Sequence, residues 1–183
     1  RAVKQKVVKP KKREIREWEK QGLIREGIFI GNQKGFGFVE VEGEEEDIFI
    51  PANATGTAMH QDHVQVLLGK EPKKGKRQEG TVIRILERAN QEIVGTFQRE
   101  RDYGFILCDN QKFSKDVYIS AKNSKGVRDG DKVVAEIIDY GDASHKPEGR
   151  ITENLGSINA PGTDILAIVK SYKIPSEFPI KVI

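Results

Sequence analysis

Two neighbouring stretches decide the fold: Lys34-Gly35-Phe36-Gly37-Phe38-Val39 and Asp47-Ile48-Phe49-Ile50. Alternate side chains of an extended strand point to opposite faces, so Phe36 and Phe38 share one face and the β-branched residues occupy the other. Phe49 likewise lies on the charged side of its own strand. Rings grouped on a polar face beside a lysine predict a platform on which nucleic-acid bases stack. The alternative is that the rings are covered by another domain or a partner.

The same pattern occurs a second time, in Tyr103-Gly104-Phe105-Ile106 and Asp116-Val117-Tyr118-Ile119. Tyr103 follows Phe36 by 67 residues, and Tyr118 follows Phe49 by 69 residues. Repeats in a solenoid are shorter than this, so the spacing indicates one domain that has been duplicated.

Short alternating segments punctuated by Gly and Asn predict five strands in each copy. The expected strands are 25–31, 36–41, 46–51, 62–69 and 79–87, then 92–98, 103–108, 115–120, 131–138 and 147–154. Closing such a sheet into a small barrel removes its exposed edges. The predicted fold class is therefore all-β, with two tandem five-stranded OB-fold barrels and a short N-terminal helix. That helix is expected at 13–24, with Gly22 as its stop signal.

Four segments follow from this organisation of the 183 residues. They are a basic arm and helix ending an upstream domain (1–24), the first barrel (25–88), the second barrel (89–155) and the first part of a further domain (156–183). The net charge of +3 hides an uneven distribution, because residues 1–13 hold seven Lys or Arg and no acid. This arm is either a polyanion-binding tail or a solvated linker.

The composition excludes several functional classes. The sequence contains no signal-peptide pattern and no apolar run long enough to span a bilayer. The lone Cys108 cannot form an intramolecular disulfide and fits a cytoplasmic location. His60 and His63 fall at a turn without the further ligands that a metal needs. No catalytic triad or phosphate-cradling glycine loop is recognisable, so the predicted catalytic set is empty.

The segment 70–77 between the fourth and fifth strands is rich in Lys and Arg. In an OB-fold the loop at this connection borders the ligand groove, which predicts phosphate contacts; a solvated loop is the alternative. In the second copy, Arg99 and Arg101 precede Tyr103 where the first copy has Lys34. Asp129 and Asp131 are expected to form a turn rather than to bind a ligand.

These aromatic motifs resemble the paired RNA-binding motifs of the cold-shock domain family. Phe29 occupies the place of that family's first-strand tryptophan, and Phe97 follows it in the second copy. The chain departs from the family after the second motif, where Pro51-Ala52 and Ser120-Ala121 replace His and Phe. The resemblance therefore implies a smaller stacking platform on each barrel.

Two such barrels followed by segments 156–165 and 174–179 are similar to the ribonuclease R family of exoribonucleases. The resemblance implies a parent enzyme that degrades RNA from 3′ to 5′ with Mg²⁺ held by clustered aspartates. Hydrolysis with two metal ions needs several carboxylates, and Asp164 alone cannot supply them. No catalytic activity and no cofactor are therefore expected of residues 1–183 themselves.

The expected partner is single-stranded RNA, including the 3′ overhang of a structured RNA, with no membrane and no small-molecule cofactor. The rival hypotheses are a free-standing RNA chaperone or antiterminator, and a barrel pair whose rings bind protein. The residues expected to contact RNA are aromatic or basic side chains: Phe29, Lys34, Phe36, Phe38, Phe49, Lys73, Lys74, Lys76, Arg77, Arg99, Arg101, Tyr103, Phe105 and Tyr118.

Overall fold

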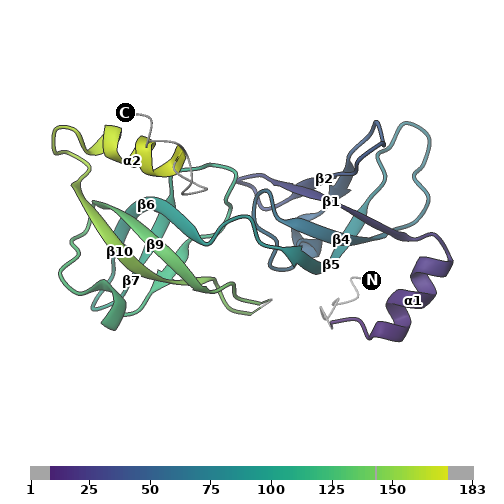
Figure 1. The fold of residues 1–183 in the computed structure, drawn as a ribbon, viewed down its shortest axis with the longest axis horizontal. Helices are drawn as coiled ribbons and strands as arrows, with labels where there is room; N and C mark the ends of the chain where they lie inside the picture. The colour runs from purple at the N-terminus through teal and green to yellow at the C-terminus, as the bar shows by residue number, and fades with distance from the viewer. Residues whose placement is uncertain (1–8, 143, 173–183) are drawn as a thin grey trace, which may run out of the picture. The chain divides into compact units, whose positions relative to one another are not determined.

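A computed structural model describes residues 9–142 and 144–172 of the chain (Figure 1). The chain divides into two compact units, the first built on strands β1–β5 and the second on β6–β10. Residues 1–8 of the predicted basic arm and the predicted segment 174–179 lie outside the described residues. The all-β class and the duplicated five-strand plan are both confirmed.

The first unit is a five-stranded sheet in the order β3-β2-β1-β4-β5, in which all neighbours are antiparallel. Its two ends meet where the N–H of Phe49 donates to the carbonyl of Gln78 at 2.8 Å, next to a parallel bridge between Phe49 and Glu79. The strands are β1 (Ile24–Gly31), β2 (Gly37–Glu40), β3 (Ile48–Ile50), β4 (His63–Leu68) and β5 (Gly80–Glu87).

The second unit is a closed barrel in the order β10-β8-β7-β6-β9. Its closure is more complete than that of the first unit: the N–H of Tyr118 donates to the carbonyl of Pro147 at 2.8 Å and β8 pairs with β10 in parallel. Among the described residues, the first unit has only the single bridge at Phe49, so it is a half-closed form of the predicted barrel. The strands are β6 (Glu92–Arg99), β7 (Gly104–Cys108), β8 (Val117–Ile119), β9 (Asp131–Asp139) and β10 (Glu148–Ser157).

Short helical elements complete both units. The predicted N-terminal helix is α1 (Lys12–Lys20), and Gly22 follows it with a φ of +72°, as expected for a stop signal. A 3₁₀ turn follows β3 and β8: η1 (Ala52–Ala54) and η2 (Lys122–Ser124). Each turn lies in the connection that leads to the fourth strand of its barrel, β4 or β9.

A second α-helix, α2 (Thr163–Tyr172), lies within the segment that the sequence assigned to a further domain. In the structure, Ala167 of α2 packs with Val94 and Val134 on the second barrel. The packing of the second barrel therefore continues past the boundary predicted at residue 155. The apolar residues of α2 lack a clear stripe, which is why the sequence did not indicate this helix.

The core of the first barrel consists of the residues that alternate with the outward-facing rings. Val39, Ile48 and Ile50 are buried together with Phe29, as the strand alternation predicts for the first three. Gly37 lies so close to the Phe29 ring that a Cβ at this position would be 2.4 Å from Phe29 Cζ. Glycine is therefore required between the two outward-facing phenylalanines.

The second barrel repeats this contact. A Cβ on Gly104 would lie 2.4 Å from Cζ of Phe97, whose side chain is fully buried. Glycine in the aromatic motif thus has a packing function that is separate from any flexibility of the backbone. In each copy the buried ring, Phe29 or Phe97, fills the space that the glycine leaves by having no side chain.

A buried carboxylate joins the residues after β5 to the connection between β3 and β4. Asp62, which is fully buried, accepts hydrogen bonds from the N–H groups of Met59 at 2.9 Å and Ala89 at 2.8 Å. Arg88 pairs with the same carboxylate at 3.0 Å and donates to the carbonyl of Thr57 at 2.7 Å. Buried charges require this kind of pairing, so the chain leaving β5 is fixed to the β3–β4 connection.

We predict that Gly37→Ala lowers the free energy of unfolding by about 1–3 kcal/mol, the usual cost of overpacking. The added methyl group must displace the Phe29 ring. Thermal melts will measure the effect, and the double variant with Phe29→Leu provides the control, because shortening the inner side chain should recover part of the stability. An unchanged melting temperature for Gly37→Ala would contradict the packing argument.

Candidate nucleic-acid interface

The three outward-facing phenylalanines of the first barrel form one cluster. The ring centroids of Phe36 and Phe38 are 5.9 Å apart, and Phe49 lies 5.7 Å from the first and 5.5 Å from the second. All three side chains are partly exposed, whereas Val39, next to Phe38 in sequence, is buried. We call Phe36, Phe38 and Phe49 the first ring triad; it offers exposed π-faces on the surface of β2 and β3.

The second barrel carries an equivalent cluster. Tyr103, Phe105 and Tyr118 have ring centroids 5.7–5.9 Å apart and are partly exposed. They form the second ring triad. The sequence repeat therefore predicts both which rings come together and which face they share.

A cation lies over one ring of each triad. The guanidinium carbon of Arg77 is 5.1 Å from the centroid of Phe38, and the Nζ of Lys146 is 4.9 Å from that of Phe105. Both distances are within the range of a cation–π interaction. Lys146 is absent from the residues predicted from sequence, although it follows Arg77 by 69 residues, the repeat spacing that would have identified it.

The other predicted cations of the first barrel are exposed. Lys34 lies in the turn before Phe36, where its N–H donates to Oδ1 of Asn32 at 2.9 Å. On the loop between β4 and β5, five cations are exposed: Lys70, Lys73, Lys74, Lys76 and Arg77. In the second barrel, Arg101 is exposed in the turn between β6 and β7. Phosphate contacts by these side chains remain a prediction.

Arg99 has a structural role that the sequence did not reveal. Its guanidinium donates to the carbonyls of Val127 at 2.8 Å, Ser124 at 2.6 Å and Asp102 at 2.9 Å. It also lies 4.9 Å above the ring of Phe97. Most donors of Arg99 are thus occupied within the barrel, and its assignment as a phosphate ligand stays a prediction.

Phe29 lies in a different environment from the one that the family resemblance implies. Its side chain is only 3% exposed and belongs to the core of the first barrel. A ring enclosed in this way has no face on which a base can stack. Gly37 allows this inward placement, so the position that matches the family's first-strand aromatic residue is a core position in this chain.

The acidic turns and the cysteine support the barrel rather than a reactive site. Asp129 accepts a hydrogen bond from the N–H of Arg99 at 2.9 Å, and Asp131 accepts one from the N–H of Arg128 at 2.8 Å, as expected of turn-forming residues. Burial, with Asp116 and Asp109 nearby, raises the pKa of the Cys108 thiol to about 12. The thiolate that would be reactive is therefore scarce at neutral pH.

Within residues 9–142 and 144–172, no group of three or more His, Cys, Asp or Glu side chains is arranged to hold a metal ion. The described residues therefore do not fit the Mg²⁺ that the family resemblance implies for a parent enzyme. His60 instead uses its Nδ1 to accept a hydrogen bond from the N–H of Gly31 at 3.1 Å. Neither described helix has the length and apolar character needed to cross a membrane.

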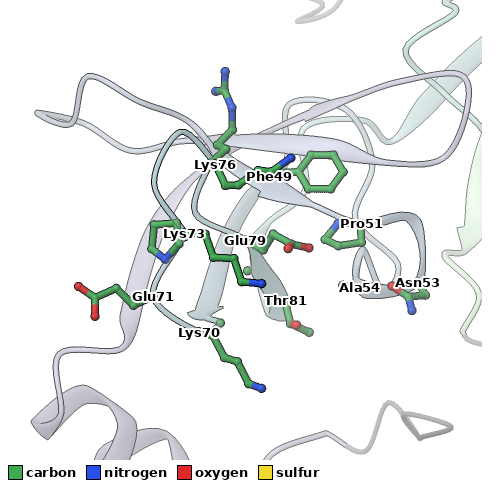
Figure 2. A pocket seen from close by; sticks show the side chains of 14 residues that line it. Phe49, Pro51, Asn53, Ala54, Lys70, Glu71, Lys73, Lys76, Glu79 and Thr81 are labelled. Atoms are coloured by element: carbon green, nitrogen blue, oxygen red, sulfur yellow. The ribbon is translucent and has the colours of Figure 1, made fainter. Parts of the chain in front are cut away.

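A groove of about 920 Å³ adjoins the first ring triad (Figure 2). Phe49 and Pro51 form one end, the lysine-rich loop forms one wall, and η1 contributes Asn53 on the other side. The volume lies within the range of roughly 300–1,000 Å³ that is typical of small-ligand clefts. The first barrel thus combines exposed rings with an adjacent basic groove.

Comparison with known proteins is consistent with this arrangement. Residues 27–85 match the family described as the ribonuclease B OB domain, and residues 105–179 match the cold shock domain family. Ribonuclease R of Vibrio parahaemolyticus is 35% identical over 164 residues, which cover 88% of this chain and 19% of that protein. The chain is homologous to part of ribonuclease R.

Solved structures show the same fold. A ribonuclease R from Mycoplasma genitalium, in complex with ribose-methylated single-stranded RNA, has a TM-score of 0.69 and 21% identity, covering 79% of this chain and 23% of that one. Yeast Ssd1, a pseudonuclease, has a TM-score of 0.71 and 19% identity, covering 87% of this chain and 26% of the yeast chain. The chain spans about a fifth of the length of the curated ribonuclease R relative.

The two arginines near the second ring triad offer a matched test in this ribonuclease R homologue. Arg99→Gln should lower the free energy of unfolding by about 1–3 kcal/mol, because buried carbonyls lose their donors. Arg101→Gln removes the same charge from an exposed position and should change stability by less than about 0.5 kcal/mol. Chemical denaturation will compare them, and equal stability of the two variants would contradict the structural role of Arg99.

Proposed function

We propose that the two ring triads bind single-stranded RNA and that the barrels belong to a 3′→5′ exoribonuclease of the ribonuclease R type. The observation that carries this proposal is the presence, on both barrels, of three partly exposed rings with a cation over one of them. Stacking on aromatic rings suits every base, and nearby cations neutralise phosphates. This combination binds RNA without requiring a particular sequence.

The proposed role is to capture a single strand, including a 3′ overhang of a structured RNA, and to guide it to a catalytic domain. The similarity to ribonuclease R and the RNA-bound Mycoplasma genitalium structure support this role. Mg²⁺ would act in the catalytic domain, and the parent protein would act in the cytoplasm. The described residues contribute strand binding and orientation.

The outer side of α2 supports the proposal that a further domain adjoins the second barrel. Ile165 is 67% exposed and Tyr172 is 74% exposed, although both are large apolar or aromatic residues. A neighbouring domain that covers them would gain from removing this surface from water. Ala167, on the inner side, already packs against the barrel.

A free-standing RNA chaperone would use the same rings, so RNA binding alone does not separate it from a nuclease component. The similarity to ribonuclease R along 88% of the chain favours the nuclease. A barrel pair that binds protein through its rings would differ more clearly, since its rings would not affect affinity for RNA.

Phe38→Ala should weaken binding of a short single-stranded RNA by about 1–3 kcal/mol, because it removes a stacking surface. Its cost in stability should stay below the roughly 3–5 kcal/mol of a buried Phe→Ala change, since the ring is partly exposed. Fluorescence titration and thermal melts will measure the two effects.

Val39→Ala is the matched control on the opposite face of β2, where the side chain is fully buried. It should lower the melting temperature and leave the affinity of the folded protein unchanged. If Phe38→Ala unfolds the barrel yet keeps full affinity, the proposed interface is wrong. Unchanged affinity without unfolding would favour the protein-binding alternative.

In the full-length protein, the double variant Phe38→Ala and Phe105→Ala should raise KM for a long single-stranded RNA and leave kcat on a dinucleotide unchanged. The reason is that a ground-state binding surface remote from the chemistry contributes to KM alone. Release of labelled mononucleotides in the presence of Mg²⁺ is the measurement. A full-length protein that releases none would favour the chaperone.

A further inference from the structure

The two barrels carry matching rings but differ in the loop beside them. The first barrel's segment 70–77, between β4 and β5, holds five Lys or Arg and one acid. The corresponding segment 139–146 of the second barrel holds two Asp, one His and one Lys. Because phosphate binding is driven largely by the release of counterions, the loop of the first barrel can contribute more to phosphate binding than its counterpart.

The basic loop is held at its base. The side-chain amide of Gln78 donates to the carbonyls of Lys70 at 3.2 Å and Glu79 at 2.8 Å. At the tip of the loop, a tight turn forms in which the N–H of Lys76 donates to the carbonyl of Lys73 at 2.8 Å. A loop arranged before the ligand arrives loses less entropy on binding.

The groove beside this loop is lined by side chains of opposite charge. Lys73 and Glu79 both extend into it, while Asn53 lies on the η1 side (Figure 2). Its lining also includes Thr81, which is small and leaves room for a flat group. One end is formed by Phe49, a member of the first ring triad. The groove is therefore continuous with the platform on which bases would stack.

We infer that this groove is an additional nucleotide subsite, found next to the first ring triad, and that the basic loop makes the first barrel the stronger phosphate-binding half. The inference rests on the proposed function, because it extends the same RNA platform by one nucleotide. Lys70 and Lys73 hold the phosphate of that nucleotide, and Glu79 and Asn53 contact the edge of its base.

The chemistry of Glu79 sets a base preference for the subsite. An ionised carboxylate can only accept hydrogen bonds. At the exocyclic position that Glu79 would contact, cytosine and adenine present an amino donor, whereas uracil presents a carbonyl acceptor and has only its ring N3–H to donate. The subsite therefore favours a base with an amino group over uracil, although the ring triads themselves accept any base.

The first test measures salt dependence with oligo(U) of about seven nucleotides, a length within the site size of an OB-fold, and the unaltered chain. The double variant Lys70→Gln and Lys73→Gln should reduce the slope of log affinity against log salt by about 0.7 for each phosphate that these lysines neutralise. The control is Arg16→Gln with Lys20→Gln, which removes the same charge from exposed positions of α1. Equal slopes for the two double variants would overturn the phosphate assignment.

The second test replaces the central uridine of this oligonucleotide by cytidine. The unaltered chain should bind the cytidine-containing strand about fivefold more tightly, which corresponds to about 1 kcal/mol. Glu79→Gln should remove most of this gain, and Phe38→Ala should weaken both strands while preserving it. A gain that survives Glu79→Gln, or no gain in the unaltered chain, overturns the subsite. Failure of the unaltered chain to bind either strand would instead overturn the proposed function.

Discussion

The contact between an inward-facing ring and a glycine backbone governs both barrels. Phe29 lies against Gly37, and Phe97 lies against Gly104, at distances that leave no room for a Cβ. With the inner side of the strand filled in this way, the residues before and after the glycine project outward. The ring triads are thus a consequence of core packing, because the same close approach that fills the core presents the flanking aromatic residues to solvent.

Much of this arrangement follows from the sequence. Strict alternation separates Phe38 from Val39, and the repeat locates a second set of strands and rings. Alternation predicts the face on which a side chain lies, but it does not predict which partners from distant segments that side chain will contact. Arg99 is a basic residue at the end of β6, next to an exposed turn, yet carbonyls from a segment 25–28 residues away occupy its donors. Those hydrogen bonds depend on tertiary structure, which a local pattern does not encode.

Other differences have similarly physical origins. Family resemblance placed Phe29 among the RNA-binding residues, but the missing side chain of Gly37 lets this ring turn inward. Lys146 reaches Phe105 from a distant part of the chain and was missed because its local sequence is not basic. The helix α2 was missed because its packing uses the small Ala167 against Val94 rather than a broad apolar stripe.

The Asp62 cluster orders the chain beyond the last strand of the first barrel. β5 ends at Glu87 and β6 begins at Glu92, and within this connection Arg88 and Ala89 are bonded to the Asp62 carboxylate. The Ala89 amide lies beyond the last strand of the first barrel, yet its bond to a buried carboxylate should slow its exchange with solvent hydrogen as if it belonged to the sheet.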